Sequence, residues 1–298
     1  MHNDAYHLDE NLVRKLVEVQ FGHWSHLPLR RVDSTGTDNV IFRLGDEMCV
    51  RLPLIPSASE KLRKELACLS VLPALPLQIP RPIASGEATK DYQSPWAVYR
   101  WIEGEDVQVE GLNDMHEVAE SLAQFVRILH GSDAARIPSC GQQNNFRGCP
   151  LTERDEPTRH AISSVSDIYD AATLLAFWEN SLAIPAWTRD PVPIHGDIHA
   201  GNLLMKNGNI TAVLNFGLMG VGDPAVDLIV NWSLLPKSAR ERFRYTLEAD
   251  NNTWFRGRSW AFSTALIALS YYRLSNSFMT EMSKRVISEV LRDFRSTG

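Results

Sequence analysis

Cysteine is scarce in this sequence, and the four that occur are scattered. They are Cys49, Cys68, Cys140 and Cys149, with no Cys-x-x-Cys pair among them. A disulfide framework or a zinc site needs closely spaced cysteines, so neither is indicated. We expect a protein with reduced thiols, which favours a cytoplasmic location.

An excess of positive charge is also missing. The sequence has 30 Lys and Arg against 36 Asp and Glu, a formal net charge of -6. Nucleic-acid binding depends on basic side chains that displace counterions from phosphates, so nucleic acid is not an expected partner. No run reaches the roughly 18 apolar residues of a membrane-spanning helix, and the polar N-terminus does not resemble a secretion signal. A membrane is therefore not an expected partner either.

What is present is the composition of a globular protein, with 44% hydrophobic residues in 298. The first third has β-type patterns. Two apolar runs, Val40 to Leu44 and Met48 to Leu52, flank Gly45-Asp46-Glu47 and predict a hairpin. Residues 10–21 have apolar residues at helical spacing, and Trp96 to Ile102 predicts a buried strand.

Helical patterns dominate the remainder. Ser57 or Ser59 can cap a helix that ends near Leu72, and Asn113 can cap another that Gly131 closes. Exceptions are a loop-rich stretch, 137–158, and a tight hairpin, 203–214, that turns on an Asn-Gly pair at 207–208. A β-rich third followed by helices predicts an α+β fold with two lobes. We place the boundary after residue 102, which divides the chain into 1–102 and 103–298.

The segment His195-Gly-Asp-Ile-His-Ala-Gly-Asn202 carries the clearest chemical signal. Phosphoryl transfer needs a carboxylate to receive the proton of the acceptor hydroxyl and oxygen ligands to hold Mg²⁺ against the phosphates. Asp197 and Asn202 suit these roles, at the spacing found in the protein-kinase catalytic loop H-R-D-x-x-x-x-N. We expect the two histidines of the segment to bond the loop rather than to bind metal. The hairpin then returns the chain to Asn215, where a second metal ligand is expected.

With Asn215-Phe-Gly and Gly222-Asp-Pro-Ala-x-Asp227, this segment resembles the aminoglycoside phosphotransferase family. Further similar segments are STGTDN at 34–39, VRLP at 50–53, VYRWIEGE at 98–105 and RG-x-PL at 147–151. The resemblance covers nearly the whole chain. It implies a bilobal protein-kinase-like fold, with a small β-sheet N-terminal lobe that binds nucleotide and a larger, mainly helical C-terminal lobe.

The resemblance also implies an activity. The γ-phosphoryl group of ATP or GTP, bound with Mg²⁺, would pass to a hydroxyl of an aminoglycoside-like or other small polar acceptor, a cationic one included. Asp197 would be the catalytic base, and Asn202 and Asn215 the metal ligands. Arg51 would hold the phosphates, oriented by Glu65, with Glu60 as the competing choice.

The remaining roles follow in the same way. The loop that contains Ser34 and Gly36 would cover the phosphates. A hinge would bind adenine through main-chain groups, and its residues are Arg100, Trp101 and Ile102. Asp223 and Asp227 have two readings left open: contact with a cationic acceptor, or a turn in which Asp223 bonds nearby backbone.

The departure from the family pattern is Asn215, where the family has an aspartate that binds Mg²⁺. An amide offers one neutral oxygen where a carboxylate offers charge and two oxygens. Three explanations are open. The substitution is native and weakens transfer, it is native and compensated by Asp223, or it was engineered to trap a substrate complex. A nucleotide- or ligand-binding sensor with little transfer activity is therefore the alternative function. A protein kinase is disfavoured, because no A-P-E motif or activation segment follows Gly217.

Overall fold

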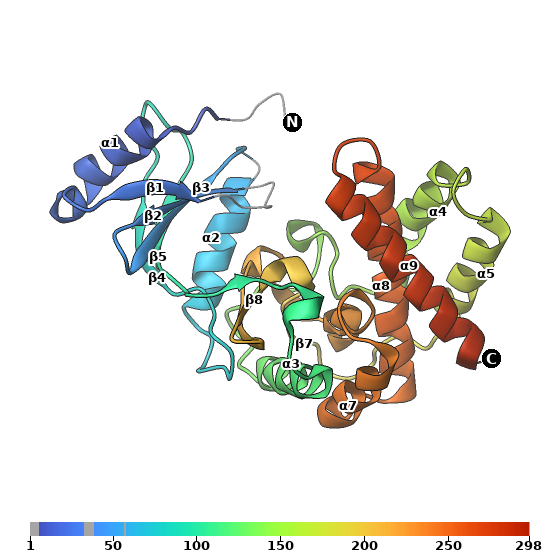
Figure 1. Ribbon diagram of the computed structural model, residues 1–298. Coiled ribbons are helices and arrows are strands. Elements are labelled where there is room, and N and C mark those ends of the chain that lie inside the picture. The colour runs from blue at the N-terminus through green and yellow to red at the C-terminus, as the bar shows by residue number, and fades with distance from the viewer. Residues whose placement is uncertain (1–5, 33–38, 57, 298) are drawn as a thin grey trace.

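The computed structural model describes residues 6–32, 39–56 and 58–297. Its first part is an antiparallel sheet of five strands with two helices (Figure 1). The strands are β1 (Leu29–Val32), β2 (Asn39–Leu44), β3 (Met48–Pro53), β4 (Pro82–Gly86) and β5 (Trp96–Arg100), in the order β1-β2-β3-β5-β4. The helices are α1 (Glu10–Gln20) and α2 (Ala58–Leu69), and a 3-10 turn, η1 (Gly22–Trp24), follows α1.

Successive side chains of each strand point to opposite faces of this sheet, and the two faces pack against different elements. On one face, Val40, Val50 and Val98 pack with residues of α1. On the other, Arg51 lies opposite Ile41 and Ala97 in the β2–β3 and β3–β5 pairs. Side chains that share a face are neighbours across the strands. The second face, which α2 also contacts through β3, therefore carries the arginine of the expected nucleotide site.

The second part of the chain is mainly helical (Figure 1). Helix α8 packs along α9 and α3 packs on α7. The α-helices are α3 (Met115–His130), α4 (Asp155–Ser164), α5 (Ala171–Leu182), α6 (Val230–Ser233), α7 (Lys237–Leu247), α8 (Asn251–Tyr272) and α9 (Ser277–Thr297). The 3-10 turns are η2 (Val109–Gly111), η3 (Gln142–Asn144), η4 (Leu151–Arg154), η5 (Ala200–Asn202), η6 (Phe216–Leu218) and η7 (Pro224–Ile229).

Five short strands form two small sheets in this helical part. They are β6 (Glu105–Asp106), β7 (Val192–Ile194), β8 (Leu203–Lys206), β9 (Asn209–Val213) and β10 (Gly220–Gly222). Strands β8 and β9 make the expected hairpin, with φ of 53° at Asn207 and 76° at Gly208, and β6 pairs with β8. Strand β7 pairs with β10. The segment 195–202 lies between these two sheets, because it runs from the end of β7 to the start of β8.

Three expected boundaries need correction. The strand expected to reach Ile102 ends at Arg100, where β5 ends. The helix expected to begin at Asn113 is capped by Asp114, whose side chain accepts a hydrogen bond from the His116 N–H. Asn113 instead donates to the carbonyl of Asn207, a contact across 94 residues that sequence spacing does not reveal. The loop-rich stretch contains η3 and η4 and the start of α4.

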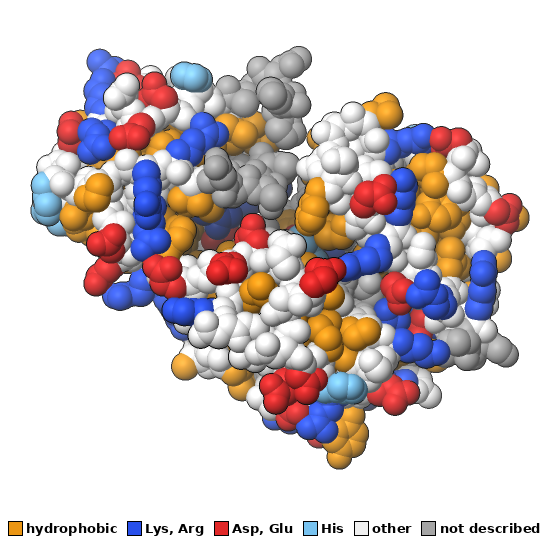
Figure 2. All heavy atoms as spheres, viewed as in Figure 1, with side chains coloured by type: hydrophobic (Ala, Val, Ile, Leu, Met, Phe, Trp, Pro, Cys, Tyr) orange, Lys and Arg blue, Asp and Glu red, His pale blue; other side chains and the backbone are white. Residues whose placement is uncertain are grey.

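The two parts lie either side of a hollow in the molecular surface (Figure 2). Helix α2 connects them, since it packs against the turn η6. Its Lys64 donates a hydrogen bond from Nζ to the carbonyl of Gln143, in the loop before Arg147, at 2.9 Å. This fold confirms the expected α+β architecture. The division at residue 102 stays a prediction.

Candidate active site

The segment 195–202, which contains the expected catalytic base, leaves β7 through a sharp turn at Gly196, where φ is +81°. A Cβ atom at this position would lie 2.8 Å from the carbonyl oxygen of Leu218, so both the backbone angle and the space favour glycine. Asp227, fully buried, accepts hydrogen bonds from the backbone N–H groups of His195 (3.0 Å) and Gly196 (2.7 Å). It also lies 3.0 Å from Nε2 of His130. The turn is therefore held from inside the protein.

His195 is a buried loop-bonding histidine. Its Nε2 lies 2.9 Å from the carbonyl of Leu214, and its Nδ1 accepts from the N–H of Asp197 at 3.2 Å. This pattern requires a proton on Nε2 and none on Nδ1. Burial lowers the pKa of His195, which keeps the ring neutral. The ring also meets Phe216 edge-on, with 4.6 Å between centroids.

Asp197 lies at the centre of the site with its side chain 17% exposed. Oδ1 is 3.4 Å from Nη2 of Arg147, and Oδ2 accepts from Nδ2 of Asn202 at 3.1 Å. Nε2 of His199 is 3.6 Å from Oδ2. Burial would raise the pKa of this carboxyl group, but His199, Arg147 and His195 outweigh it and hold the pKa below its usual range. Asp197 is therefore ionised at neutral pH and can accept a proton only transiently.

Asn202 and Asn215 lie side by side next to this carboxylate. Nδ2 of Asn202 donates to both the carbonyl and the side chain of Asp197, and its Oδ1 accepts from Nδ2 of Asn215 at 3.2 Å. Asn215 is in the left-handed region, with φ of 64° and ψ of 66°, a conformation that asparagine adopts more readily than most residues. The structure therefore brings together the three residues expected around the transferred phosphate.

These residues can be tested against a magnesium ion by their chemistry. Within the described ranges, no group of three or more His, Cys, Asp or Glu side chains could hold a metal. The site offers the amide oxygens of Asn202 and Asn215 beside the carboxylate of Asp197. Mg²⁺ is usually held by one or two carboxylates together with substrate phosphates. The residues fit the ion in position, but two neutral amides bind it more weakly than the aspartate pattern would.

On the nucleotide side, the structure pairs Arg51 with Glu65 and not with Glu60. Nη1 of Arg51 lies 2.5 Å from Oε1 of Glu65, which is fully buried on α2. Glu60 pairs with Arg63 in solvent. Burial would lower the pKa of Arg51, but the neighbouring Glu65 outweighs it, so the guanidinium of Arg51 keeps its charge.

Tyr99 is a member of this cluster that sequence reasoning missed. Its hydroxyl donates to Oε1 of Glu65 at 3.3 Å, and burial raises the pKa of Tyr99, so the phenol keeps its proton. The alternation of side chains along the strands could have indicated Tyr99, because it lies opposite Cys49 in the β3–β5 pair, on the same face as Arg51. Oε2 of Glu65 is buried without a hydrogen-bond partner among the described residues.

The expected hinge follows β5. The N–H of Arg100 donates to the carbonyl of Arg81 (2.9 Å), and that of Trp101 donates to the carbonyl of Glu47 (2.7 Å). Both of these N–H groups are therefore committed inside the protein, and the binding of a base by this hinge stays a prediction. Ser34 and Gly36 lie outside the described residues.

Asp223 and Asp227 have partners within the protein. Asp223 caps η7 by accepting from the Ala225 N–H, and it forms a buried ion pair with Arg256 at 2.6 Å. Asp227 accepts a hydrogen bond from the turn at Gly196 and has no exposed surface. These contacts agree with the structural reading of the two that the sequence left open, and a contact with an acceptor stays a prediction.

Arg147 is the second residue that sequence reasoning missed. Its Nη1 donates to the Thr264 hydroxyl at 2.7 Å while Nη2 faces Asp197. Burial lowers the pKa of Arg147, against the opposing charges of Asp197 and Asp227. The RG-x-PL segment marks this arginine in the sequence, but its partners lie 50 and 117 residues away. Only the fold brings them together.

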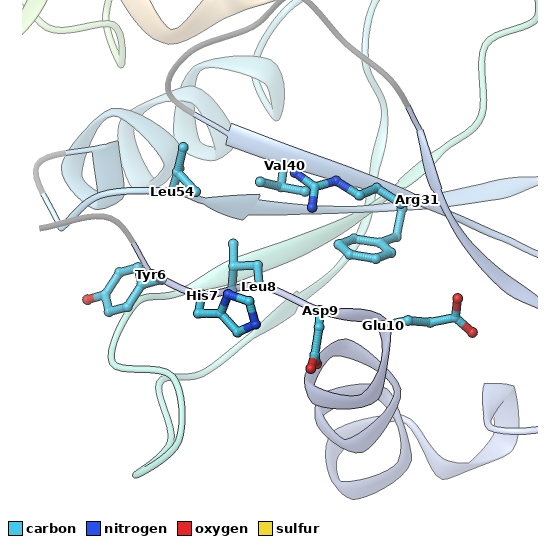
Figure 3. Close-up of a pocket in the computed structure, with 9 residues that line it drawn as sticks. Tyr6, His7, Leu8, Asp9, Glu10, Arg31, Val40 and Leu54 are labelled. Atoms are coloured by element: carbon cyan, nitrogen blue, oxygen red, sulfur yellow. The ribbon is translucent and has the colours of Figure 1, made fainter. Parts of the chain in front are cut away.

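A cavity of about 430 Å³ lies elsewhere, beside the N-terminal sheet (Figure 3). The segment before α1 forms one side of it, and Arg31, Val40 and Leu54 line the other. Since Val40 is on the face that packs with α1, this cavity is not on the face that carries Arg51. We assign it no role in the candidate site.

Among the helices of the described chain, none is long and apolar enough to cross a membrane.

Comparison with known proteins gives a consistent result. The model of the phosphotransferase enzyme family (APH) matches residues 30–260. The GDP complex of aminoglycoside 2'-phosphotransferase-IIIa has a similar structure, with a TM-score of 0.74, 16% identity, and coverage of 96% of this chain and 100% of that one. The streptomycin–ATP–APH(2")-IIa ternary complex has a TM-score of 0.64 at 18% identity, covering 96% and 97%.

Macrolide 2'-phosphotransferase MphH from Brachybacterium faecium has a TM-score of 0.63 at 22% identity, covering 93% of this chain and 97% of that chain. The comparison with curated protein sequences found no match. At these identities the structural likeness supports the fold, and the family model covers more than half of the chain. The chain therefore belongs to the phosphotransferase enzyme family, with a protein-kinase-like fold.

Proposed function

We propose that the protein transfers the γ-phosphoryl group of ATP or GTP to a hydroxyl of a small polar acceptor, at a rate limited by Asn215. One observation carries this proposal: the carboxylate of Asp197 is ionised and partly exposed to solvent, and Asn202 donates a hydrogen bond to it. Solved relatives contain GDP, ATP or ADP, and some contain kanamycin or gentamicin. Aminoglycoside-like compounds are therefore one acceptor class to test.

The proposed reaction assigns a role to each group. The acceptor hydroxyl attacks the γ-phosphorus, an oxygen–phosphorus bond forms, and the bond to the β–γ bridging oxygen breaks to release the nucleoside diphosphate. Asp197 receives the hydroxyl proton. Arg51, held by Glu65, binds phosphate oxygens, and the hinge at 100–102 binds the base. Mg²⁺, when bound by Asn202 and Asn215, would neutralise charge on the phosphates.

A sensor that binds nucleotide or ligand without transfer is the second candidate. The observation in its favour is the Asn215–Asn202 hydrogen bond, which satisfies the amide oxygen without a cation. A sensor of this kind binds nucleotide equally well with and without Mg²⁺.

One experiment separates the two. Binding of ATP, GTP and ADP is measured by calorimetry with Mg²⁺ and with EDTA, and transfer from labelled ATP is measured on a panel of aminoglycosides, macrolides and sugars. Magnesium-dependent binding and labelled product support the kinase. The absence of nucleotide binding at millimolar Mg²⁺ rejects the kinase and a sensor of nucleotide, and turnover of about 1 s⁻¹ or more rejects any sensor.

A further inference from the structure

A second cavity, of about 350 Å³, lies in the helical part of the chain, where α6 packs on α9 and α3 packs on α7 (Figure 1). Its volume is in the range of sites that bind small organic molecules. None of the described residues that line it belongs to the nucleotide side or to the group around Asp197. It is therefore separate from the candidate active site.

Part of the lining is apolar and rigid. Its apolar side chains are Val109, Met115, Trp232, Leu234 and Leu235. The last three are at most 5% exposed, and we call them the base of the cavity. The ring of Trp232 packs on that of Trp254, with 5.0 Å between centroids, and its Nε1 donates to Asp293 at 3.3 Å. The base is therefore held in place and offers an aromatic surface to an apolar ligand.

The charged part of the lining is mainly basic. Four basic and two acidic side chains line the cavity, in a chain whose formal net charge is -6. They are Lys237, Arg240, Arg285 and Arg292, with Glu289 and Asp293. Lys237, Arg285 and Arg292 are exposed and form its rim. The local charge is thus opposite in sign to that of the whole chain, which favours a ligand with negative charge.

Both acids of the lining are already engaged by arginines. Glu289 accepts a hydrogen bond from Arg240 at 2.7 Å, and it also pairs with Arg292. Asp293 lies 3.4 Å from Nη1 of Arg258 and accepts the indole N–H described above. Each carboxylate is therefore shared between donors, and the two together do not balance the basic side chains.

Arg285 supplies an unbalanced charge at the rim. It shares a face of α9 with Glu289 and Arg292, at positions i, i+4 and i+7. Its Nη2 donates to the carbonyl of Ser233, which holds the guanidinium against α6. Among the described residues it forms no ion pair. A guanidinium held by a neutral carbonyl keeps further N–H groups for an anion.

The start of α7 adds to this positive field. The helix begins at Lys237, on the rim of the cavity, and its first turn contains no acidic residue. The positive end of the helix dipole therefore supports the charge of the rim.

We propose that this cavity binds a small amphipathic anion, with an aromatic or aliphatic body and one carboxylate, phosphate or sulfonate group. The body would lie on the base of the cavity, and the anionic group would face the rim, Arg285 foremost. Because the cavity is separate from the candidate active site, this inference does not depend on the proposed function.

The test compares two fluorescent probes that differ in charge. Anilinonaphthalene sulfonate carries an anionic group, and phenylnaphthylamine has the same rings without it. Each is titrated with the full chain. We expect saturable binding of the sulfonate with a Kd of about 100 µM or less, and binding of the neutral amine about 10-fold weaker.

Three variants locate the probe. The double variant Arg285→Gln, Arg292→Gln removes charge from the rim and should weaken sulfonate binding about 10-fold, with less than about 2-fold change for the amine. Met115→Trp fills the cavity without changing its charge and should weaken both probes. Arg127→Gln, which removes an exposed arginine of α3 outside the lining, is the control and should leave both unchanged.

Several results overturn the proposal. They are no saturable sulfonate binding below about 1 mM, equal affinity for the two probes, or full sulfonate binding by the double variant. Binding that Met115→Trp leaves unchanged, or that ADP displaces, also overturns it, because the probe would then lie outside this cavity. If Met115→Trp does not fold, the double variant and the neutral probe decide alone, since both arginines of that variant are exposed.

Discussion

Asn215 donates a hydrogen bond from its side-chain amide to Oδ1 of Asn202, over 3.2 Å. The accepting oxygen is the atom that Asn202 would offer to a magnesium ion. An aspartate at position 215 would place a carboxylate oxygen next to Oδ1 of Asn202. The two oxygens would repel each other unless a cation lay between them. The amide at position 215 therefore stabilises the metal-free site and weakens the metal-bound one.

Replacing Asn215→Asp is expected to increase phosphoryl transfer. The carboxylate adds one charged ligand to the metal, and a single preorganised electrostatic contact is worth about 10² to 10³ in kcat. Transfer or hydrolysis of labelled ATP at saturating Mg²⁺ measures the gain. The double variant Asn215→Asp, Asp197→Asn is the control and should remove it. Equal rates for the original chain and Asn215→Asp would contradict this account of the site.

The same substitution should make stability depend on magnesium. Without metal, Asn215→Asp loses the hydrogen bond to Asn202 and unfolds at a lower temperature. With Mg²⁺ at about 10 times its Kd, binding returns roughly 1.4 kcal/mol, or a few degrees in Tm. Differential scanning calorimetry with Mg²⁺ and with EDTA tests this, and the original chain should respond less. A larger magnesium response in the original chain would reverse the argument.

Glu65→Gln is expected to weaken both the fold and nucleotide binding. It leaves Arg51 without its buried partner, a change that costs about 3 kcal/mol or more in comparable pairs. It also frees the guanidinium from its fixed orientation, so the Kd for ADP should rise about 10-fold. Urea unfolding and calorimetry measure the two effects.

The matched control for that variant is Glu60→Gln on the same helix. Its ion pair with Arg63 is exposed, so its loss should change stability by less than about 1 kcal/mol and leave ADP binding unchanged. If the two variants behaved alike, Glu65 would not be the residue that orients Arg51.

The pH dependence of Asp197 follows from its lowered pKa. The folded-state pKa lies below the unfolded value, so this group adds stability above about pH 4 that is lost as the pH falls through the folded pKa. His199→Gln removes the side chain that contributes most to lowering the Asp197 pKa and should therefore raise it. NMR titration of the carboxyl carbon measures it, with His116→Gln on the surface of α3 as the control. An unchanged pKa in His199→Gln would remove His199 from this explanation.

Asp227→Asn is expected to act on stability rather than on an acceptor. Its two oxygens take the N–H groups of His195 and Gly196, and an amide offers only one acceptor oxygen. We expect a loss of about 3 kcal/mol in the free energy of unfolding. Asp114→Asn, at an exposed helix cap where asparagine also caps well, should be nearly neutral. A stable Asp227→Asn protein would contradict the structural role.

Local patterns predicted those parts of the fold that neighbouring residues determine. The Asn207-Gly208 turn appears where expected because both residues adopt positive φ readily, and the β2–β3 hairpin turns at Gly45 for the same reason. The spacing of Asp197 and Asn202 also sufficed, since their contact spans only five residues. Each of these features is determined by residues only a few positions apart in the sequence.

Other parts depend on contacts that no local pattern encodes. Asn113 is a reasonable cap candidate by residue type, but its side chain bonds the distant Asn207, and Asp114 caps the helix that begins at Met115. Arg147 and Arg154 meet α8 more than 100 residues away. Two-residue and three-residue strands such as β6 and β7 are too short to give a periodic signal, and pairing partners define them.

The hydrogen bond from Lys64 to Gln143 links the nucleotide side of the site to the acceptor side. Helix α2 holds Arg51 through Glu65, packs on η6 next to Asn215, and is tied to the loop that leads to Arg147. A ligand that shifts this helix alters all three at once. Occupancy of the nucleotide side and of the acceptor side should therefore be thermodynamically coupled, with each ligand changing the affinity of the other by the same factor.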